Sequence, residues 1–217
     1  HSFPTRRSSD LQLGFVEGLR KVARSVPIVV VADGFEVSQG MHAVSVDQRH
    51  GARLATQHLI GLGHRQIAHI SGPDDWFDAR ERVIGWREAL EDAGLEVPEV
   101  MVGDWSAESG YAMGGRLLDE GLPDAVFCSN DTMALGLLAC LADLGIRVPD
   151  DISLVGYDDA NGAAFFQPPL TTIRQPFEEL GARCVEVLLE AIEGHEPEPQ
   201  RIRPSLRVRR SCRRHQN

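Results

Sequence analysis

Short apolar runs alternate with amphipathic stretches along almost the whole chain. A continuous β-branched run predicts a strand buried on both faces at 28–31, and further short strands are expected near 42–46, 66–70, 100–102, 125–128, 152–155, 171–173 and 206–209. Apolar residues at helical spacing predict helices over about 12–24, 47–62, 79–93, 106–120, 131–144 and 177–192. Because strands that alternate with helices favour parallel sheets with right-handed crossovers, the expected fold class is α/β.

The composition is that of a globular protein, and it argues against two classes of partner, membranes and DNA. Of its 217 residues, 42% are hydrophobic and 25% are charged, and no apolar run approaches the ~20 residues of a membrane span. The net charge is −10, whereas duplex binding depends on Lys and Arg that neutralise phosphates. We therefore expect no membrane partner and no DNA binding by this chain alone.

Basic residues gather near the C-terminus, while cysteines are scattered. The basic group is interpreted as a solvated tail on an edge strand rather than a nucleic-acid patch: Arg201, Arg203, Arg207, Arg209, Arg210, Arg213 and Arg214. The four cysteines form no C-x-x-C pair and have no histidine at zinc-ligand spacing. Cysteines within apolar patterns fit a reduced cytosol better than secretion, so we expect a cytoplasmic protein without a metal site.

The first eleven residues differ from everything that follows. Residues 1–11 (HSFPTRRSSDL) show no apolar periodicity, and they match one reading frame of a common short-read sequencing adapter. We expect them to be an adapter-derived artefact, the alternative being a natural polar leader, and we set them aside before reasoning about the fold. Different codons in the nucleotide sequence would contradict the adapter interpretation.

Polar and aromatic residues follow the ends of several expected strands. In open parallel sheets, ligands bind at the carboxyl ends of the strands, so these residues are expected to share one rim. Carboxylates and amides can pair with several hydroxyl groups, and an aromatic ring can cover the apolar face of a sugar. The sequence therefore favours a neutral polyhydroxyl ligand at a rim formed by Asp33, Asp104, Trp105, Ser129, Asn130, Asp131, Asp158 and Asp159.

Each of these residues also has an ordinary structural interpretation. Asp131 or Asn130 can cap the following helix, and capping is the interpretation that we prefer for Asp131. Trp105 can equally be a core aromatic residue, and residues 158–159 can form a solvated turn. Arg82, on a predicted helix, can make a surface ion pair. Only the common placement at strand ends favours a binding site.

The sequence lacks the common motifs of enzymes. It contains no G-x-S-x-G elbow, no G-x-x-x-x-G-K-[ST] loop, no H-E-x-x-H pair and no G-x-G-x-x-G after a strand. Sequence neighbours such as Asp158 and Asp159 do not by themselves make a catalytic pair. The eight histidines are scattered, and His58 and His64 are expected on or near a helix surface. We therefore expect neither an enzyme nor a bound cofactor.

Several longer motifs resemble the LacI/GalR family of bacterial transcription regulators. They are GARLAT at 51–56, HLIGLGHRQIA at 58–68, SNDTMALG at 129–136, VPDDISLVGYDD at 148–159 and PPLTTIRQ at 168–175. The stretch GDWSAESGY at 103–111 is close to that of the member that gives the family its name. The resemblance covers about 27–210, and several long motifs in the right order make it specific.

The resemblance implies two Rossmann-like subdomains of the type I periplasmic binding protein kind, joined by three crossovers around a ligand cleft. Residues 12–46 and 173–203 would belong to an incomplete N-terminal subdomain, and residues 47–172 and 204–212 to the C-terminal one. The helix-turn-helix headpiece, the hinge and the opening part of the first subdomain are expected to be absent, so half of the cleft wall would be missing.

The resemblance also implies effector contacts, position by position. Arg82 matches the family arginine that clamps effector hydroxyl or carboxylate groups, a role that suits its planar fork. The other matches are Trp105 for the aromatic wall, Asn130 and Asp158 for polar contacts, Phe177 near a crossover and Gln175 beside it.

Two positions depart from the family pattern. The family often has an aspartate at the end of the strand that begins at Pro27, whereas Ala32 stands there in this chain and Asp33 follows it. Asp78 replaces a residue near the arginine that is often small. Both aspartates are therefore counted as candidate ligand contacts, and the identity of the ligand stays open.

The function that the resemblance implies is the ligand-sensing and dimerisation core of a DNA-binding regulator, expected to be a repressor. A small sugar or related metabolite would close the cleft, and the homodimer would contact operator DNA only through the missing headpiece. A periplasmic sugar-binding protein of a transporter shares the architecture and is the alternative, and a sugar-processing enzyme ranks third. An upstream signal peptide would support the transporter, and a helix-turn-helix the regulator.

Overall fold

The computed structural model describes residues 15–215, so the expected adapter segment at 1–11 lies outside the described residues. The helices are α1 Val16–Ala23, α2 Gln48–Gly61, α3 Phe77–Asp92, α4 Ala107–Asp119, α5 Asp131–Asp143, the short 3₁₀ helix η2 Ala163–Phe165 and α6 Phe177–Ile192. The strands are β1 Ile28–Val31, β2 Met41–Val46, β3 Ile67–Ser71, β4 Met101–Val102, β5 Ala125–Cys128, β6 Ser153–Asp158, β7 Thr171–Arg174, β8 Gln200–Ile202 and β9 Ser205–Arg207.

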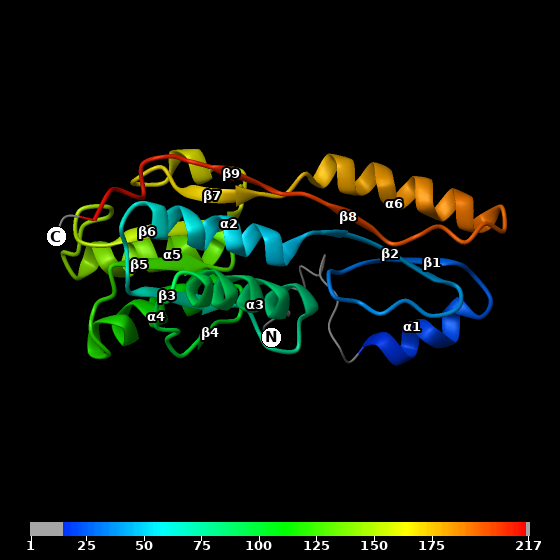
Figure 1. The fold of residues 1–217 in the computed structure, drawn as a ribbon, viewed down its shortest axis with the longest axis horizontal. Helices are drawn as coiled ribbons and strands as arrows, with labels where there is room; N and C mark the ends of the chain where they lie inside the picture. The colour runs from blue at the N-terminus through cyan, green and yellow to red at the C-terminus, as the bar shows by residue number, and fades with distance from the viewer. Residues whose placement is uncertain (1–14, 216–217) are drawn as a thin grey trace, which may run out of the picture.

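These strands form two sheets that follow one another along the longest axis of the molecule (Figure 1). The larger sheet has the order β4-β3-β5-β6-β7-β9, and its neighbours are parallel except for the antiparallel pair β7–β9. The smaller sheet has the order β1-β2-β8 and is wholly parallel. The predicted α/β class with parallel sheets is confirmed.

Helices cover the larger sheet on both faces, as the burial of its central strand β5 shows. All four residues of β5 are buried, and they alternate between two core clusters. Ala125 and Phe127 pack in the cluster that contains the apolar residues of α2 and α3. Val126 and Cys128 pack in the cluster that contains those of α4 and α5. A strand buried on both faces must be apolar throughout, which explains the continuous run in the sequence.

The smaller sheet also has a helix on each side. Val44 and Val46 of β2 form a core cluster with Leu180 and Val187 of α6. On the other side, Ala23 of α1 belongs to a cluster with β1 and the start of β2. Phe77, the first residue of α3, also packs against this second cluster, so the apolar contacts of the smaller sheet reach a helix that covers the larger one.

Three chain segments connect the two sheets. The chain passes from β2 to α2 at Asp47, from β7 to α6 at 175–176, and from β8 to β9 at 203–204. The first and third segments lie side by side, since the backbone N–H of Asp47 donates to the carbonyl of Ile202 at 2.8 Å. The number of crossovers agrees with the resemblance, while the boundaries of the subdomains remain a prediction.

Two local expectations differ from the structure. Strand β6 runs on through Gly156 and Tyr157 to Asp158, because Tyr157 is fully buried against the larger sheet's core. His64 was expected on a helix surface, and this prediction was wrong. Its side chain is 3% exposed, because the segment after α2 packs against the C-terminal residues Arg213 and His215.

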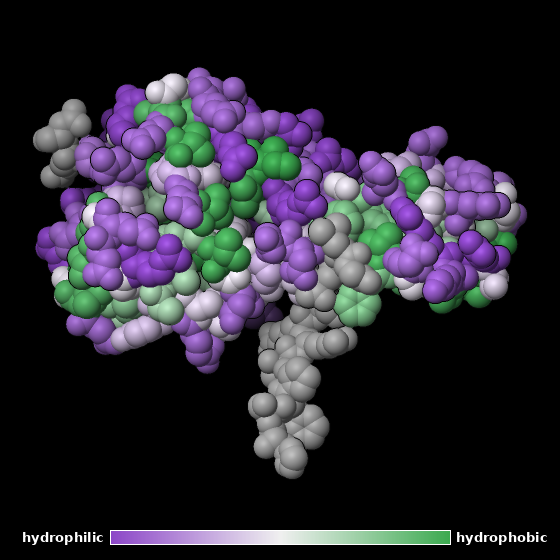
Figure 2. All heavy atoms as spheres, turned by 90° about the horizontal axis from the view of Figure 1, so that it is seen from below, coloured by the Kyte–Doolittle hydropathy of each residue, from purple (hydrophilic) through white to green (hydrophobic). Residues whose placement is uncertain are grey.

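The molecular surface is mostly hydrophilic, with hydrophobic side chains in separate patches on the face that Figure 2 shows. Within residues 15–215, none of the helices combines the length and the apolar character that crossing a bilayer requires.

Candidate functional site

The guanidinium of Arg82 is buried and held by hydrogen bonds at the carboxyl edge of the larger sheet. Arg82 lies on α3 and is only 2% exposed. Its Nε donates to Oε1 of Gln48 at 2.9 Å, and its Nη1 donates to the carbonyl of Ser129 at 2.5 Å. Its Cζ stands 4.0 Å from the ring centroid of Tyr157 and 5.5 Å from that of Trp105. Cation–π attraction therefore adds to the hydrogen bonds that orient this group.

A chain of side-chain hydrogen bonds links Arg82 to the segments between the sheets. Nε2 of Gln48 donates to Oδ2 of Asp78 at 3.0 Å and to Oε1 of Gln175 at 2.9 Å. Nε2 of Gln175 in turn donates to Oδ1 of Asp158 at 2.7 Å, and that oxygen lies 4.0 Å from Nη2 of Arg82. Residues from α2, α3, β6 and the second crossover thus form one polar network.

Trp105 covers one side of this network. Its indole packs directly over Gly72, where a Cβ would lie 2.1 Å from the ring, and it meets Trp76 edge-on at a centroid distance of 5.9 Å. Its Nε1 is buried and has no hydrogen-bond partner among the described residues. A buried donor without a partner costs about 1–3 kcal/mol, so this N–H is suited to an acceptor that a ligand brings.

Backbone strain is concentrated in the same place. Among the described residues, the non-glycine residues with positive φ are Trp105 at 73°, Asp158 at 107° and Asp159 at 55°. Such conformations cost about 1–3 kcal/mol each and persist where the surrounding structure holds them, typically at functional sites. All three lie at the carboxyl edge of the larger sheet: Asp158 ends β6, Asp159 follows it, and Trp105 lies shortly after β4.

Comparison with known proteins decides the family. Residues 56–212 match the model of the periplasmic binding protein-like domain. A solved dimeric Lac repressor with a C-terminal deletion is 33% identical and superposes with a TM-score of 0.86, over 95% of this chain and 76% of the repressor chain. The chain belongs to the LacI family.

Other members of the LacI family match almost as much of the chain. The HTH-type transcriptional repressor PurR of Shigella sonnei is 40% identical over 193 residues, which are 87% of this chain and 57% of PurR. The transcriptional regulator CelR, solved as a complex with cellobiose, is 40% identical with a TM-score of 0.80, over 84% of this chain and 58% of CelR. The chain thus spans a little more than half the length of these two relatives.

The structure brings together most of the residues that the LacI resemblance selected. Arg82, Asp78, Gln175 and Asp158 lie in the polar network, and Trp105 covers it. The alternative of a surface ion pair for Arg82 is wrong, because the residue is buried. Whether these residues bind an effector remains a prediction.

Asn130 caps α5, and Asp131 does not. Oδ1 of Asn130 accepts from the backbone N–H of Met133 at 2.7 Å, so Asn130 caps α5, and its Nδ2 donates to the carbonyl of Trp105 at 3.0 Å. The preferred capping role of Asp131 is therefore wrong. Its carboxylate accepts from the Oγ1 of Thr172 at 2.6 Å and the backbone N–H of Ala160 at 2.7 Å. Burial raises the pKa of Asp131 to about 7.

Asp33 lies shortly after β1, and its carboxylate accepts hydrogen bonds from the start of α2 and from β8. It is 2% exposed, and Oδ1 and Oδ2 accept from Nε and Nη2 of Arg201 at 2.9 and 2.8 Å. Oδ2 also accepts from the backbone N–H of Gln48 at 2.9 Å. Its own N–H donates to Oδ1 of Asp78 at 2.8 Å. Asp33 therefore joins the smaller sheet to the network.

The expected solvated basic tail is wrong for three of its arginines, of which Arg213 pairs with Asp150 at 3.1 Å. Arg201 binds the buried Asp33, as described, because β8 pairs with β2 beside it. Arg209 pairs with Asp159 at 2.5 Å and donates to the carbonyl of Leu170 at 2.7 Å, because β9 brings it back along β7. The alternative of a solvated turn is wrong as well, because Asp159 pairs with Arg209 and Asp158 accepts a hydrogen bond from Gln175.

Among the predicted site residues, Phe177 has the least structural support for a role in the site. It begins α6 directly after the second crossover, and it is 52% exposed.

The sequence did not single out Gln48, and it gave neither Ser129 nor Tyr157, both expected after strand ends, a contact with Arg82. Gln48 looks like an ordinary polar residue in the first turn of a helix, and only its partners from three distant segments show its importance. Tyr157 was placed in a loop, although its ring lies under Arg82.

Proposed function

We propose that this chain is the effector-binding core of a LacI-type transcription regulator, acting as a repressor, and that a small sugar or related metabolite is the effector. The observation that carries the proposal is the buried, fully oriented guanidinium of Arg82 beside Trp105 and Asp158 at the sheet's carboxyl edge. The CelR complex with cellobiose supports a sugar, as does a LacI-family regulator from Enterococcus faecium solved with ribose, at 31% identity and a TM-score of 0.81.

The chemistry of these groups suits a polyhydroxyl ligand. The Arg82 fork can donate to two oxygens of a hydroxyl pair, and the Asp158 carboxylate can accept from others. The Trp105 ring offers an apolar wall, and its indole N–H a donor. Because these groups are oriented by protein hydrogen bonds, binding loses little conformational entropy at the site.

The rest of the assembly is proposed from the relatives. Residues 12–46 and 173–203 would form part of one subdomain, residues 47–172 and 204–212 the other, and two chains would make a homodimer. Operator DNA would be contacted by a headpiece outside this acidic chain, whose net charge is −10. The protein would act in the cytoplasm and catalyse no reaction, as the relatives named above are regulators.

Effector binding would act through the crossovers. Contacts with Arg82 and Asp158 would change the bonds of Gln48, which begins α2 directly after the first crossover, and of Gln175, which lies in the second crossover. Rotation of one sheet against the other would alter the spacing of two headpieces, and half-sites a helical turn apart require a fixed spacing. A coupling free energy of ~1–3 kcal/mol would change operator affinity about 5- to 150-fold.

Calorimetry with a panel of mono- and disaccharides tests the proposal. We expect one sugar class to bind the protein that contains this chain, and Arg82→Ala to abolish the heat signal. Arg87→Ala is the matched control, since Arg87 lies on the same helix and is exposed. Unchanged sugar binding in a folded Arg82→Ala variant would show that Arg82 does not contact the effector. Binding without any effect on operator affinity would instead favour the transporter alternative.

A further inference from the structure

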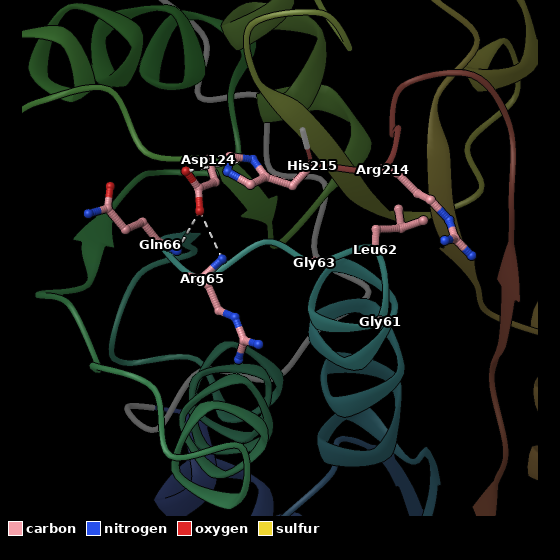
Figure 3. A pocket seen from close by; sticks show the side chains of 8 residues that line it. All are labelled: Gly61, Leu62, Gly63, Arg65, Gln66, Asp124, Arg214 and His215. Carbon is pink, nitrogen blue, oxygen red and sulfur yellow. Dashed lines mark hydrogen bonds and ion pairs between the residues drawn. The ribbon is translucent and has the colours of Figure 1, made fainter. Parts of the chain in front are cut away.

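Three potential metal ligands meet at the edge of the larger sheet opposite the candidate effector site. His64 follows α2, Asp124 precedes β5 and His215 follows β9, and one ligand atom from each lies within 4.8 Å of the others. A cavity of about 530 Å³ opens beside them and is lined by Gly63, Arg65, Gln66, Asp124, Arg214 and His215 (Figure 3).

His64 has the protonation state and the free lone pair that a metal ligand needs. Its Nε2 lies 3.0 Å from the carbonyl oxygen of Arg213. A carbonyl oxygen only accepts, so Nε2 carries the proton and Nδ1 is left with a lone pair. Nδ1 is buried and has no hydrogen-bond partner in the described part of the chain. Histidine ligands characteristically donate their other N–H to a backbone carbonyl or a carboxylate, which fixes the tautomer in this way.

Asp124 is oriented by the backbone in a similar manner. Its Oδ2 accepts from the N–H groups of Arg65 at 2.8 Å and Gln66 at 3.0 Å. Its Oδ1 lies 4.0 Å from Nδ1 of His215. One carboxylate oxygen is thus held by the chain turn before β3, and the other faces the histidine.

His215 completes the cluster from the C-terminal segment. Its backbone N–H donates to the carbonyl of Leu62 at 2.9 Å, and its ring packs edge-on against His64 at a centroid distance of 5.5 Å. In Figure 3 the His215 ring and the Asp124 carboxylate point toward one another, whereas the guanidinium groups of Arg65 and Arg214 point away from them. Neither arginine therefore places its positive charge next to the His64, Asp124 and His215 ligand atoms.

We propose that His64, Asp124 and His215 bind a divalent ion of the zinc class. Two imidazole nitrogens and one carboxylate oxygen are typical ligands of Zn²⁺, whereas Mg²⁺ and Ca²⁺ prefer oxygen ligands throughout. Tetrahedral Zn²⁺ needs ligand atoms about 3.4 Å apart, so the ligands have to close by roughly 1 Å, and water from the cavity would fill the fourth position. The ion would fasten residues 213–215 to the start of β3 and β5.

No spacing rule reveals this cluster in the sequence, because the three ligands come from distant parts of the chain. The cysteine spacing predicted no metal site, and our proposal replaces that prediction.

Metal titration of the tag-free, chelator-treated chain tests the site. We expect one Zn²⁺ per chain by calorimetry, and one Co²⁺ with the visible absorption of tetrahedral nitrogen and oxygen ligation. His215→Ala and Asp124→Asn should each weaken binding at least ~10-fold, since even the loss of an outer partner does so. His195→Ala is the matched control, because His195 is exposed and lies in the loop after α6.

Thermal unfolding separates a metal site from a purely hydrogen-bonded cluster. Zn²⁺ should raise the Tm of the wild-type chain and of His195→Ala, but not that of His215→Ala. Equal Zn²⁺ affinity in His215→Ala would overturn the proposal, as would no binding to the wild type. Co²⁺ charge-transfer bands from a thiolate would do the same, because they would place the ion on a cysteine.

Discussion

Gly72 and Trp105 offer a direct test of how the candidate site is built. Gly72 lies just after β3, and the indole of Trp105 occupies the space where any other residue would place its Cβ. The backbone at Gly72 does not have the positive φ that would itself exclude alanine. Gly72→Ala therefore perturbs the packing of the indole and little else.

The size of the effect follows from the contact distances. An alanine Cβ at this position would lie 2.1 Å from Cζ2 and 2.2 Å from Cη2 of Trp105. Apolar atoms in contact are about 4 Å apart, so the ring must move by more than 1 Å. Its neighbours Trp76 and Arg82 oppose that movement. Overpacking of this kind typically costs about 1–3 kcal/mol, which is the expected loss in the free energy of unfolding.

A double-mutant cycle in urea unfolding isolates the contact. In a Trp105→Ala background the cost of Gly72→Ala should fall to within about 0.5 kcal/mol of zero. Gly115→Ala is the matched control: it lies in α4 with open space around its Cβ, and it should stabilise the chain by about 0.5–1 kcal/mol. An equal cost of Gly72→Ala in both backgrounds would refute the placement of the indole over Gly72.

Three further substitutions test other parts of the structure. Asp131 is buried and its pKa is raised from 3.8 to about 7, so its contribution to stability is fully present below pH ~4 and is lost as the pH rises to ~7. Asp131→Asn should remove up to about 4 kcal/mol of that pH dependence in urea unfolding at pH 4–8, and a parallel profile would contradict this. Arg201→Ala should cost about 1–2 kcal/mol in the same assay, because it takes two hydrogen bonds from the buried Asp33 while Arg201 itself is half exposed; a loss under 0.3 kcal/mol would count against it. Phe177→Ala should change stability by less than about 0.5 kcal/mol, since the ring is half exposed, and unchanged effector affinity by calorimetry would exclude Phe177 from the cleft.

The buried strands could be predicted from the sequence because their environment leaves few choices. Ile28–Val31 and Ala125–Cys128 were expected at the bounds that the structure shows. Parallel strands covered on both faces are apolar throughout, and the helices between them carry their own spacing. The common edge of the polar residues followed from the rule that parallel strands end together. The general position of the candidate site was therefore predictable.

The precise contacts were not predictable, because they depend on segments far apart in the chain. Nothing near Gln48 in the sequence indicates that its amide joins Arg82, Asp78 and Gln175. The positive φ of Trp105 and Asp158 also has no local signature, since tryptophan and aspartate replace the glycine that usually marks such a backbone. Strain and network geometry are properties of the assembled fold.

The placement of Gln48 gives a physical reason why a ligand at this edge would be sensed elsewhere. Its side chain accepts from Arg82 and donates to Gln175 of the second crossover, while its backbone N–H donates to Asp33, which binds Arg201 of β8. One residue thus connects the candidate effector contact to the second crossover and, through Asp33, to β8, while it directly follows the first crossover. In a buried network each lost bond leaves an unsatisfied polar group, so the members tend to rearrange together rather than singly. If the proposed effector draws Arg82 away from Gln48, we expect the bonds of Gln48 to Gln175 and Asp33 to rearrange with it, which an isolated surface arginine could not cause.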